Sequence, residues 1–308
     1  MNKHYAVIGN PVLHSLSPLI HQRAFDYHKM NARYFAYEVH DFSLFMEYFR
    51  AGQNKEKFQP YSYLGQEKSL VLQEKKLVEY REQDYSFPMQ GLSITIPYKQ
   101  NVLQVADSIS YKAKLSGAAN TLYWNDNQLI AENTDIHGFY APILEKIAQG
   151  KIYRSAFIYG AGGAARAVLV GLLHCSDIEH IYICARREEQ AQELITHIKN
   201  QQELLEQYTL NTQAKLTYIP LNHTEFACDI IVNTIPQWAE NAQSPRKDFS
   251  NVQIAYDLTY KQTPFLLKAQ EENAMILDGK KMFIEQAKAQ FYLWTQKEIP
   301  ESCYVDLF

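Results

Sequence analysis

A short loop near the N-terminus carries two hydroxyl groups that are well spaced for hydrogen bonding. The segment His14–Pro18 (HSLSP) presents Ser15 and Ser17 two residues apart, just ahead of a predicted helix. Ser17 can also serve as the N-cap of that helix with Pro18 at its first position, and capping is compatible with ligand binding. Both hydroxyls are therefore candidate binding groups.

A second pair of hydroxyls and a lysine accompany a predicted strand at residues 92–96. Ser93 and Thr95 are two residues apart in the sequence GLSITIPYK, so their side chains share one face of that strand. Lys99 follows in the first turn of a predicted helix, where the partial positive charge of a helix N-terminus disfavours an ammonium group. This local misfit beside two hydroxyls indicates a chemical role for Lys99.

An amide and a carboxylate complete the set. Asn120 lies in the sequence GAANT, and Asp135 ends the sequence ENTD at the start of a predicted helix. A simple helix cap is the structural alternative for Asp135. Together, these hydroxyl, amide, carboxylate and ammonium groups can hydrogen-bond a substrate and transfer protons.

A glycine-rich loop follows a predicted strand and opens a predicted helix. Its residues are Gly160, Ala161, Gly162, Gly163 and Ala164. Glycine at positions 160 and 162 lets a pyrophosphate approach the backbone, and the helix N-terminus offers N–H groups and partial positive charge. In this context the G-x-G-x-x-A pattern predicts dinucleotide binding, while a turn that merely closes a βα corner is the structural alternative.

The residues after the second strand of this half favour NADP over NAD. An NAD-binding sheet usually has Asp or Glu there for the ribose 2'-hydroxyl, whereas this chain has Arg186 and Arg187. Two guanidinium groups attract and clamp a 2'-phosphate. The alternative is that both arginines are solvated at the next helix and pair with Glu188 and Glu189.

The first half of the chain has a βαβα rhythm. We predict strands at 5–8, 34–39 and 92–96, helices at 18–29, 42–52 and 98–106, a hairpin of 120–124 with 128–131, and a helix from 134 or 135 to 150. Residues 53–88 interrupt this rhythm. We interpret them as an insertion with a surface helix within 67–83, which either covers its own domain or contacts a partner.

The second half predicts a doubly wound parallel sheet. Its six strands are expected at 156–159, 181–185, 216–219, 230–232, 254–257 and 275–277, followed by a helix at 282–294. The fold class is therefore α/β, with an N-terminal α/β lobe and a C-terminal Rossmann-type sheet. We expect one domain at 1–134, completed by the C-terminal helix within 279–308, and a second at 135–278.

The composition is that of an ordinary folded protein. The chain has 308 residues, of which 46% are hydrophobic and 21% charged, and this excludes disorder or coiled coil as its main organisation. A net charge of -4 gives no general attraction to nucleic acid or anionic lipid, so neither is an expected partner. The apolar run at residues 6–8 is too short for a signal peptide or a membrane span, and we expect a cytoplasmic protein.

Neither the cysteines nor the histidines predict a metal site. The four cysteines form no C-x-x-C pair, and we expect buried thiols in a reducing compartment. His14 and His21 are the histidines near the candidate site, and their spacing is not a metal signature. We expect His14 in the loop and His21 packed on its helix.

Six motifs in order identify a resemblance to a known family. The motifs are HSLSP, TIPYK, GAANTL, NTDxxG, GAGGAARA and GKKMFIEQA. In this order and spacing they resemble the shikimate dehydrogenase family over nearly the whole chain except residues 53–88. The resemblance implies NADP-dependent, reversible reduction of 3-dehydroshikimate to shikimate on the route to aromatic amino acids, with substrate and nicotinamide meeting between two lobes.

The resemblance also implies roles for individual residues. Ser15 and Ser17 would bind the substrate carboxylate, and Lys99 and Asp135 would form the catalytic pair. The remaining substrate contacts would be Ser93, Thr95, Asn120, Tyr260 and Gln286, and the cofactor would contact the glycine-rich loop, Arg186, Arg187, Thr234 and Gly279. This assignment agrees with the chemistry, because hydride addition to a ketone places negative charge on oxygen and requires a nearby proton donor, which Lys99 can supply.

The chain departs from the family pattern at three places. Ser93 stands where the family usually has Asn, residues 233–239 (NTIPQWA) replace N-T-T-P-x-G-M beside the nicotinamide, and Ala185-Arg186-Arg187 replaces N-R-T. The change at Ser93 keeps open a quinate or dual quinate/shikimate dehydrogenase, since the two compounds differ mainly by one hydroxyl and ring saturation. A catalytically silent sensor of shikimate-type ligands is a further alternative, and a monomer or a homodimer is compatible with the sequence.

Overall fold

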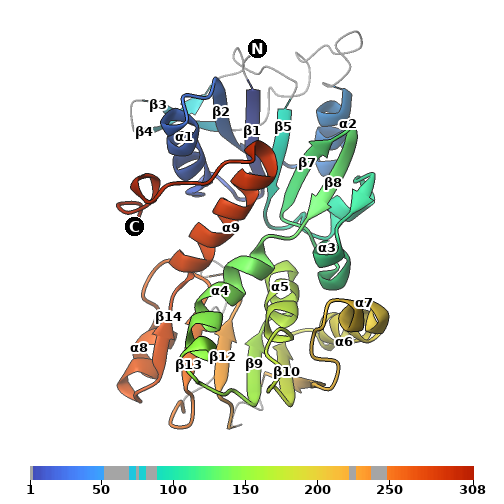
Figure 1. Ribbon diagram of the computed structural model, residues 1–308, viewed down its shortest axis with the longest axis vertical. Coiled ribbons are helices and arrows are strands. Elements are labelled where there is room, and N and C mark those ends of the chain that lie inside the picture. Colours follow the sequence, from blue (N-terminus) through green and yellow to red (C-terminus); the bar gives the residue numbers. More distant parts are fainter. Residues whose placement is uncertain (1–2, 52–68, 74–75, 81–88, 222–226, 237–247) are drawn as a thin grey trace. The chain divides into compact units, whose positions relative to one another are not determined.

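The computed structural model describes residues 3–51, 69–73, 76–80, 89–221, 227–236 and 248–308 (Figure 1). The chain divides into two compact units. Unit 1 comprises Met1–Ala113, Ala118–Thr134 and Ala287–Phe308, and unit 2 comprises Lys114–Gly117 and Asp135–Gln286. One division falls at the start of helix α4 (Asp135–Ala148), and another lies inside helix α9 (Gly279–Thr295). Each unit is described below by itself.

Unit 1 is built on a mixed sheet of eight strands in the order β4-β3-β2-β1-β5-β7-β8-β6. The strands are β1 (Lys3–Gly9), β2 (Ala32–Glu38), β3 (Ser69–Gln73), β4 (Lys76–Tyr80), β5 (Met89–Ile94), β6 (Ser108–Ile109), β7 (Thr121–Asn125) and β8 (Gln128–Glu132). The central strand β1 is parallel to both β2 and β5, whereas β7 runs antiparallel to β5 and β8. Figure 1 shows β5, β7 and β8 side by side.

Local sequence explains why two helices of unit 1 begin where they do. Helix α1 (Ser17–Tyr27) has Pro18 at its first turn, a position that proline tolerates because that backbone N–H has no intrahelical acceptor. Helix α2 (Phe42–Ala51) is preceded by Asp41, whose carboxylate accepts a hydrogen bond from the N–H of Leu44 at 3.0 Å. Both helices confirm the prediction to within two residues.

The predicted hairpin is confirmed as β7 and β8. Asp126 and Asn127 connect the strands with φ angles of 47° and 65°, a left-handed conformation that short polar side chains tolerate better than most. The turn fixes the pairing of Asn125 with Gln128 and therefore the register of the whole hairpin.

The predicted helix within residues 67–83 is wrong. The chain there forms strands β3 and β4, which extend the sheet beyond β2, with Val71 opposite Phe35 on one side and Val78 on the other. Strand β2 has backbone N–H and C=O groups along its edge that need hydrogen-bond partners. Pairing with β3 satisfies these groups, and this tertiary interaction outweighs the local helical pattern of the sequence. The other residues of the predicted insertion lie outside the described residues.

The predicted helix at 98–106 is also wrong. This segment forms turns and a short 3₁₀ helix at Asn101–Gln104. Its backbone bonds alternate between the two helical spacings, since Val102 donates to Tyr98 four residues back and Leu103 donates to Gln100 three residues back. The sequence prediction also missed β6 and helix α3 (Tyr111–Ser116), which follow directly.

Unit 2 contains the predicted parallel sheet in the order β11-β10-β9-β12-β13-β14. Its strands are β9 (Ser155–Tyr159), β10 (His180–Ala185), β11 (Lys215–Pro220), β12 (Ile230–Asn233), β13 (Ile254–Asp257) and β14 (Met275–Leu277). Every neighbouring pair is parallel, and the strand order reverses beside β9. This is the doubly wound arrangement in which ligands bind at the carboxyl ends of the strands.

Helices connect these strands. They are α5 (Gly163–Leu172), α6 (Glu188–Lys199), α7 (Gln202–Gln207) and α8 (Pro264–Glu271), with α4 before the sheet and α9 after it. Figure 1 shows α4 beside α5. The two helices approach closely at Gly171, where an added Cβ would lie 2.5 Å from the ring of Phe139.

A four-residue segment of the first half of the chain belongs to unit 2 because two side chains of that unit hold it. Arg166 on α5 donates to the carbonyl of Ser116 at 3.4 Å, and the imidazole of His197 on α6 is hydrogen-bonded to the carbonyl of Lys114 at 2.9 Å. Arg166 is buried and paired with Glu193 at 2.6 Å. The end of α3 is thereby fixed to the doubly wound unit.

The expected burial of the cysteines and the expected places of His14 and His21 are confirmed. All four cysteines are free and buried. His21 is fully buried and its ring stacks on Tyr34 with centroids 4.6 Å apart, whereas His14 is exposed in a turn. A search of the described residues finds no helix with the length and apolar character needed to cross a membrane.

Candidate active site

In unit 1 the carboxyl ends of β1 and β5 hold the hydroxyl-bearing segments together. The N–H of Asn10 donates to the carbonyl of Ile96 at 2.8 Å, and the N–H of Thr95 donates to the carbonyl of Ile8 at 2.9 Å. Gly9 permits this approach, because a Cβ at that position would lie 2.3 Å from the Cγ2 atom of Thr95. The loop after β1 and the end of β5 therefore form one edge.

The two serines of the HSLSP loop differ in exposure. Ser17 is buried at the start of α1, while Ser15 is partly exposed, and the N–H of Ser17 donates to the hydroxyl oxygen of Ser15 at 3.2 Å. Ser15 thus supplies a hydroxyl in front of the helix N-terminus, where partial positive charge favours an anionic ligand. This arrangement suits a carboxylate.

Backbone hydrogen bonds bring Lys99 and Asn120 to the same edge. The N–H of Ala119 donates to the carbonyl of Lys99 at 2.7 Å, and the N–H of Ile94 donates to the carbonyl of Asn120 at 2.7 Å. The side chain of Lys99 is partly exposed. The loop that precedes β7 therefore packs against the segment that follows β5.

Asn120 is buried, with its amide held by neighbours in the chain. Its Oδ1 atom accepts from the N–H of Thr134 at 2.8 Å and from the hydroxyl of Thr121 at 2.9 Å, and its Nδ2 atom donates to the hydroxyl of Thr134 at 2.9 Å. Its orientation is accordingly well defined.

Ser93 lies deeper than the sequence indicates. It is 4% exposed, its Oγ atom is 2.6 Å from the phenol oxygen of Tyr34, and it donates to Gln290 at 2.8 Å. Burial raises the pKa of Tyr34 well above its ordinary value, although hydrogen bonds with Ser93 and Ser17 oppose the shift. The neutral phenol of Tyr34 therefore links Ser93 to Ser17. The sequence analysis missed Tyr34 and Gln290 as members of this site.

In unit 2 a close helix crossing positions Asp135 and Gln286. Asp135 is buried in the first turn of α4, and Gln286 is buried on α9. At Gly138 an added Cβ would lie 2.5 Å from the carbonyl oxygen of Met282 and 3.0 Å from the Cβ of Gln286. Glycine at this position lets α4 and α9 approach closely, and the Nε2 atom of Gln286 donates to the carbonyl of Phe283 at 2.9 Å.

Tyr260 lies in the same part of unit 2. Its ring packs edge-on against Phe283 with centroids 5.3 Å apart. Burial raises the pKa of Tyr260, and the negative charge of Asp135 raises it further. The tyrosine is therefore a neutral hydrogen-bonding group close to that carboxylate.

The glycine-rich loop fits a dinucleotide. Gly160 has a φ of +107°, and a Cβ there would lie 2.3 Å from the hydroxyl of Thr234, so backbone conformation and packing both require glycine. Gly162 is exposed at the N-cap of α5. Among the described residues no side chain caps the helix there, and an added Cβ would meet no atom within 4 Å. The open space in front of the N–H groups of α5 can accept a pyrophosphate.

The two arginines lie at the same edge of the sheet as this loop. The N–H of Gly160 donates to the carbonyl of Cys184, the penultimate residue of β10, at 2.8 Å, and Arg186 and Arg187 follow that strand. Both side chains are exposed, and neither forms an ion pair with any residue in the described part of the chain. The expected alternative pairing with Glu188 and Glu189 is not present in this structure.

Gly279 and Thr234 have structural roles of their own. A Cβ at Gly279 would lie 2.2 Å from the carbonyl oxygen of Leu258, and the Gly279 N–H donates to Thr259 at 2.7 Å. The hydroxyl of Thr234 donates to the carbonyl of Tyr159 at 2.6 Å. Contacts of these two residues with a cofactor stay predictions, as does the role of Gln237 to Ala239, which lie outside the described residues.

A buried carboxylate that the sequence analysis did not single out organises the loop containing Tyr260. Asp257 is fully buried and accepts hydrogen bonds from Asn233 at 3.1 Å, the hydroxyl of Thr263 at 2.8 Å and the N–H of Thr259 at 3.0 Å. These bonds join the ends of β12 and β13 to the start of α8. The sequence did contain a signal for this role, because Asp257 is an acidic residue at the end of an otherwise apolar strand.

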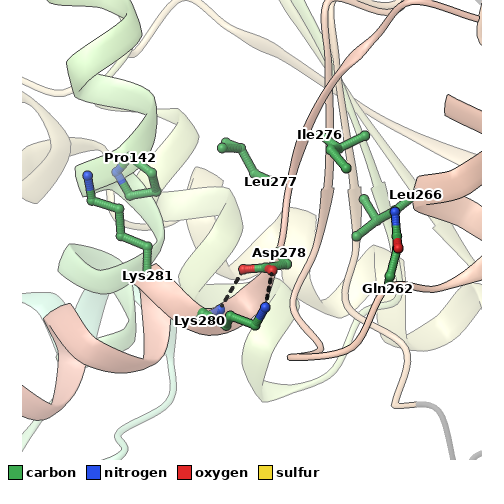
Figure 2. A pocket seen from close by; sticks show the side chains of 8 residues that line it. All are labelled: Pro142, Gln262, Leu266, Ile276, Leu277, Asp278, Lys280 and Lys281. Atoms are coloured by element: carbon green, nitrogen blue, oxygen red, sulfur yellow. Dashed lines mark hydrogen bonds and ion pairs between the residues drawn. The ribbon is translucent and has the colours of Figure 1, made fainter. Parts of the chain in front are cut away.

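A surface pocket of about 380 Å³ lies elsewhere in unit 2 (Figure 2). Asp278 accepts from the N–H of Lys280 and forms an ion pair with its ammonium group, both at 3.1 Å, and Lys281 pairs with Glu145. The pocket is lined by Pro142, Gln262, Leu266, Ile276, Leu277, Asp278, Lys280 and Lys281, none of which is a candidate site residue.

Comparison with known proteins identifies the family. The family model for the shikimate dehydrogenase substrate-binding domain matches residues 7–59 and 55–122. The shikimate dehydrogenase (NADP(+)) of Synechocystis sp. is 32% identical over 305 residues, covering 96% of this chain and 90% of its own, and that of Pelagibacter ubique is 30% identical over 312 residues, covering 98% and 96%.

A solved structure shares the fold over the same length. A shikimate dehydrogenase crystallised in complex with NADP+ superposes with a TM-score of 0.74 at 26% identity, covering 99% of this chain and 94% of its own. The matches to the sequence relatives cover 96% and 98% of this chain and therefore both units. The chain belongs to the shikimate dehydrogenase family.

Proposed function

We propose that the protein catalyses the reversible, NADP-dependent reduction of 3-dehydroshikimate to shikimate. The observation that carries this proposal is the convergence of Lys99, Asn120 and the HSLSP loop on one edge of unit 1 in a member of this family. Unit 1 would supply most of the substrate contacts, and the doubly wound unit 2 would bind NADP.

The substrate carboxylate is assigned to Ser15 and Ser17. The hydroxyl of Ser15 at the helix N-terminus can donate to a carboxylate without a full positive charge, and the partial charge of α1 supports the anion. Ser17 holds this turn through its N–H, which donates to Ser15, and through its hydrogen bond with Tyr34. The ring hydroxyls of the substrate are assigned to Thr95, Asn120, Tyr260 and Gln286. The raised pKa of Tyr260 keeps its phenol protonated at neutral pH, so it can donate as well as accept.

Lys99 and Asp135 are assigned to the chemical step. Bound NADPH supplies the hydride, and negative charge then develops on the ketone oxygen of the substrate. The ammonium group of Lys99 donates a proton to that oxygen. The carboxylate of Asp135 accepts a hydrogen bond from a substrate hydroxyl, and in the reverse direction the proton of the substrate hydroxyl returns to the amine of Lys99.

The cofactor assignment rests on unit 2. The backbone of residues 160–164 and the N-terminus of α5 receive the pyrophosphate, and the exposed guanidinium groups of Arg186 and Arg187 receive the 2'-phosphate. Thr234 and Gly279 are assigned to the nicotinamide side of the site.

A steady-state assay with two substrates and two cofactors tests this function. Purified protein is assayed with shikimate and quinate, each with NADP and with NAD, by the appearance of the reduced nicotinamide. We expect the highest kcat/KM for shikimate with NADP. A higher value with quinate would favour the quinate dehydrogenase alternative, and binding of shikimate without NADP reduction would favour the sensor.

The cellular setting follows from the proposed reaction. A pathway enzyme with four buried free thiols suits the reducing cytoplasm, and a small polar substrate is its expected partner. A monomer or a homodimer is proposed, and light scattering of the purified protein distinguishes the two.

A further inference from the structure

A continuous line of buried side-chain hydrogen bonds runs through unit 1 and ends at Asn120. The phenol oxygen of Tyr34 is 2.6 Å from the Oγ atom of Ser93, and Ser93 is 2.8 Å from the Oε1 atom of Gln290. The Nε2 atom of Gln290 is 2.9 Å from the hydroxyl of Thr121, which is 2.9 Å from the Oδ1 atom of Asn120. Each of the five residues is at most 4% exposed.

The neighbours of Gln290 fix the direction of these bonds. Its Nε2 atom also donates to the backbone carbonyl of Asn120 at 3.0 Å, and a carbonyl can only accept. The other end of the amide is therefore an oxygen, so Ser93 must donate its single proton to it. Ser93 then has only lone pairs to offer Tyr34, and the phenol is the donor in that bond.

The same logic continues from Gln290 to Asn120. Since Thr121 accepts from Gln290, its own proton is directed to the Oδ1 atom of Asn120. The N–H of Thr134 donates to the same oxygen at 2.8 Å. Two donors on one side of the amide require oxygen there, which places the NH₂ group of Asn120 on the opposite side.

We infer that Gln290 and Thr121 are positioning residues of the substrate site, which orient the side-chain amide of Asn120 with its oxygen toward Thr121 and with its NH₂ group, which donates to the hydroxyl of Thr134, on the opposite side. Ser93 acts through Gln290, because its proton holds the oxygen of that amide in place. This inference rests on the proposed function, which assigns Asn120 to substrate binding.

The alternative is that Gln290 only attaches α9 to the sheet of unit 1. A structural role of that kind affects stability without altering recognition of the substrate. Gln22 on α1 provides a matched control, since it is also buried and donates to the carbonyl of Ala32 at 3.2 Å and to Asp26 at 3.0 Å. Its Oε1 atom accepts from the backbone N–H of Tyr34 at 3.1 Å, and within the described part of the chain its side chain makes no hydrogen bond to Ser93, Thr121 or Asn120.

The kinetic test compares Gln290→Leu with Gln22→Leu, and Thr121→Val with Thr121→Ser. Loss of one well-oriented hydrogen bond corresponds to about a tenfold change in affinity. We expect the KM for shikimate to rise about tenfold in Gln290→Leu and Thr121→Val, with the KM for NADP unchanged. Gln22→Leu and Thr121→Ser, which keeps the hydroxyl, should retain the wild-type KM for shikimate.

A second measurement does not depend on activity. The side-chain NH₂ resonances of Asn120 in the free protein are assigned by NMR from their loss in Asn120→Asp. We expect Gln290→Leu to shift these resonances and Gln22→Leu to leave them in place. If the wild type does not oxidise shikimate with NADP, the proposed function fails, while this spectrum still decides whether Gln290 orients Asn120. Unshifted Asn120 resonances in Gln290→Leu, or equal KM changes in the two leucine variants of an active enzyme, would overturn the inference.

Discussion

The backbone carbonyl of Lys99 accepts a hydrogen bond from the N–H of Ala119 at 2.7 Å. This bond joins the segment after β5 to the loop before β7, so the residue with the ammonium group lies beside the loop that carries Asn120. The two groups come from positions 21 residues apart in the sequence. Their proximity is a property of the sheet rather than of either local motif.

Gly160 and Gly162 should respond differently to the same substitution. Gly162→Ala adds a Cβ that meets no atom of the described residues within 4 Å, so we expect an unchanged melting temperature. The KM for NADP should rise about tenfold or more, because the methyl group enters the space for the pyrophosphate. Gly160→Ala, with a φ of +107° and a clash with Thr234, should lower the free energy of unfolding by about 1–3 kcal/mol.

Thermal unfolding and NADP titration of both glycine variants check this prediction. The KM for shikimate serves as an internal control and should not change in Gly162→Ala. A destabilised Gly162→Ala protein with normal NADP binding would mean that the glycine serves the fold and that the pyrophosphate lies elsewhere.

Replacing Arg186 with Asp and Arg187 with Ile should move the cofactor preference toward NAD. The two exposed guanidinium groups form no ion pair with a described residue, so the substitution removes charge that is available to a 2'-phosphate. Charge-assisted bonds contribute about 1.5–3 kcal/mol each, which predicts a fall of about 10- to 100-fold in kcat/KM for NADP. Steady-state kinetics with both cofactors measure the change, and an unaltered KM for NADP would place the phosphate elsewhere.

His21 should make the protein sensitive to acid. Burial lowers the pKa of His21 to about 3, whereas an unfolded histidine titrates near 6.5. Between pH 6.5 and pH 3 the unfolded state therefore binds a proton at this histidine and the folded state does not. The free energy of unfolding accordingly decreases as the pH falls from 6.5 toward 3. At pH 5 the loss from this residue is about 2 kcal/mol relative to pH 8.

The variant His21→Phe should remove this part of the acid sensitivity. The side chain of Gln290 faces the ring of His21, but neither ring nitrogen makes a hydrogen bond of ordinary geometry with a described residue. The ring packs against Tyr34, so a phenyl ring suits the site. Urea unfolding at pH 8 and pH 5 gives the two free energies, with the exposed His14→Gln as control. Equal pH dependence in wild type and His21→Phe would contradict the buried, neutral assignment.

The parts of the fold that could be predicted are those with a local signal. The strands of unit 2 are short apolar runs bounded by turn residues, as at Ile230–Asn233. Because both faces of such strands are buried, their residues are almost all apolar, and the run can be recognised from the sequence alone. The glycine-rich loop is a contiguous motif that needs no knowledge of distant residues. Strand β3 was missed because its partner, β2, lies more than 30 residues earlier in the chain.

The candidate site was only partly predictable for the same reason. Asn120 and Lys99 belong to short motifs, but Gln290 acts through a contact between α9 and β7 that no local pattern encodes. One signal was present, because Gln286 and Gln290 are four residues apart and share a face of α9. Ser93 was interpreted as a direct substrate contact, and only its partners Tyr34 and Gln290 point to an indirect role.

The most direct test of the proposed mechanism is the turnover of Lys99→Ala. Removing the proton donor should lower kcat by about 10²- to 10⁴-fold, with a small effect on the KM for shikimate, because the group acts in the transition state. Lys151→Ala, at an exposed position, serves as the control. A Lys99→Ala enzyme with wild-type kcat and a much higher KM would contradict the mechanism and leave Lys99 as a binding residue alone.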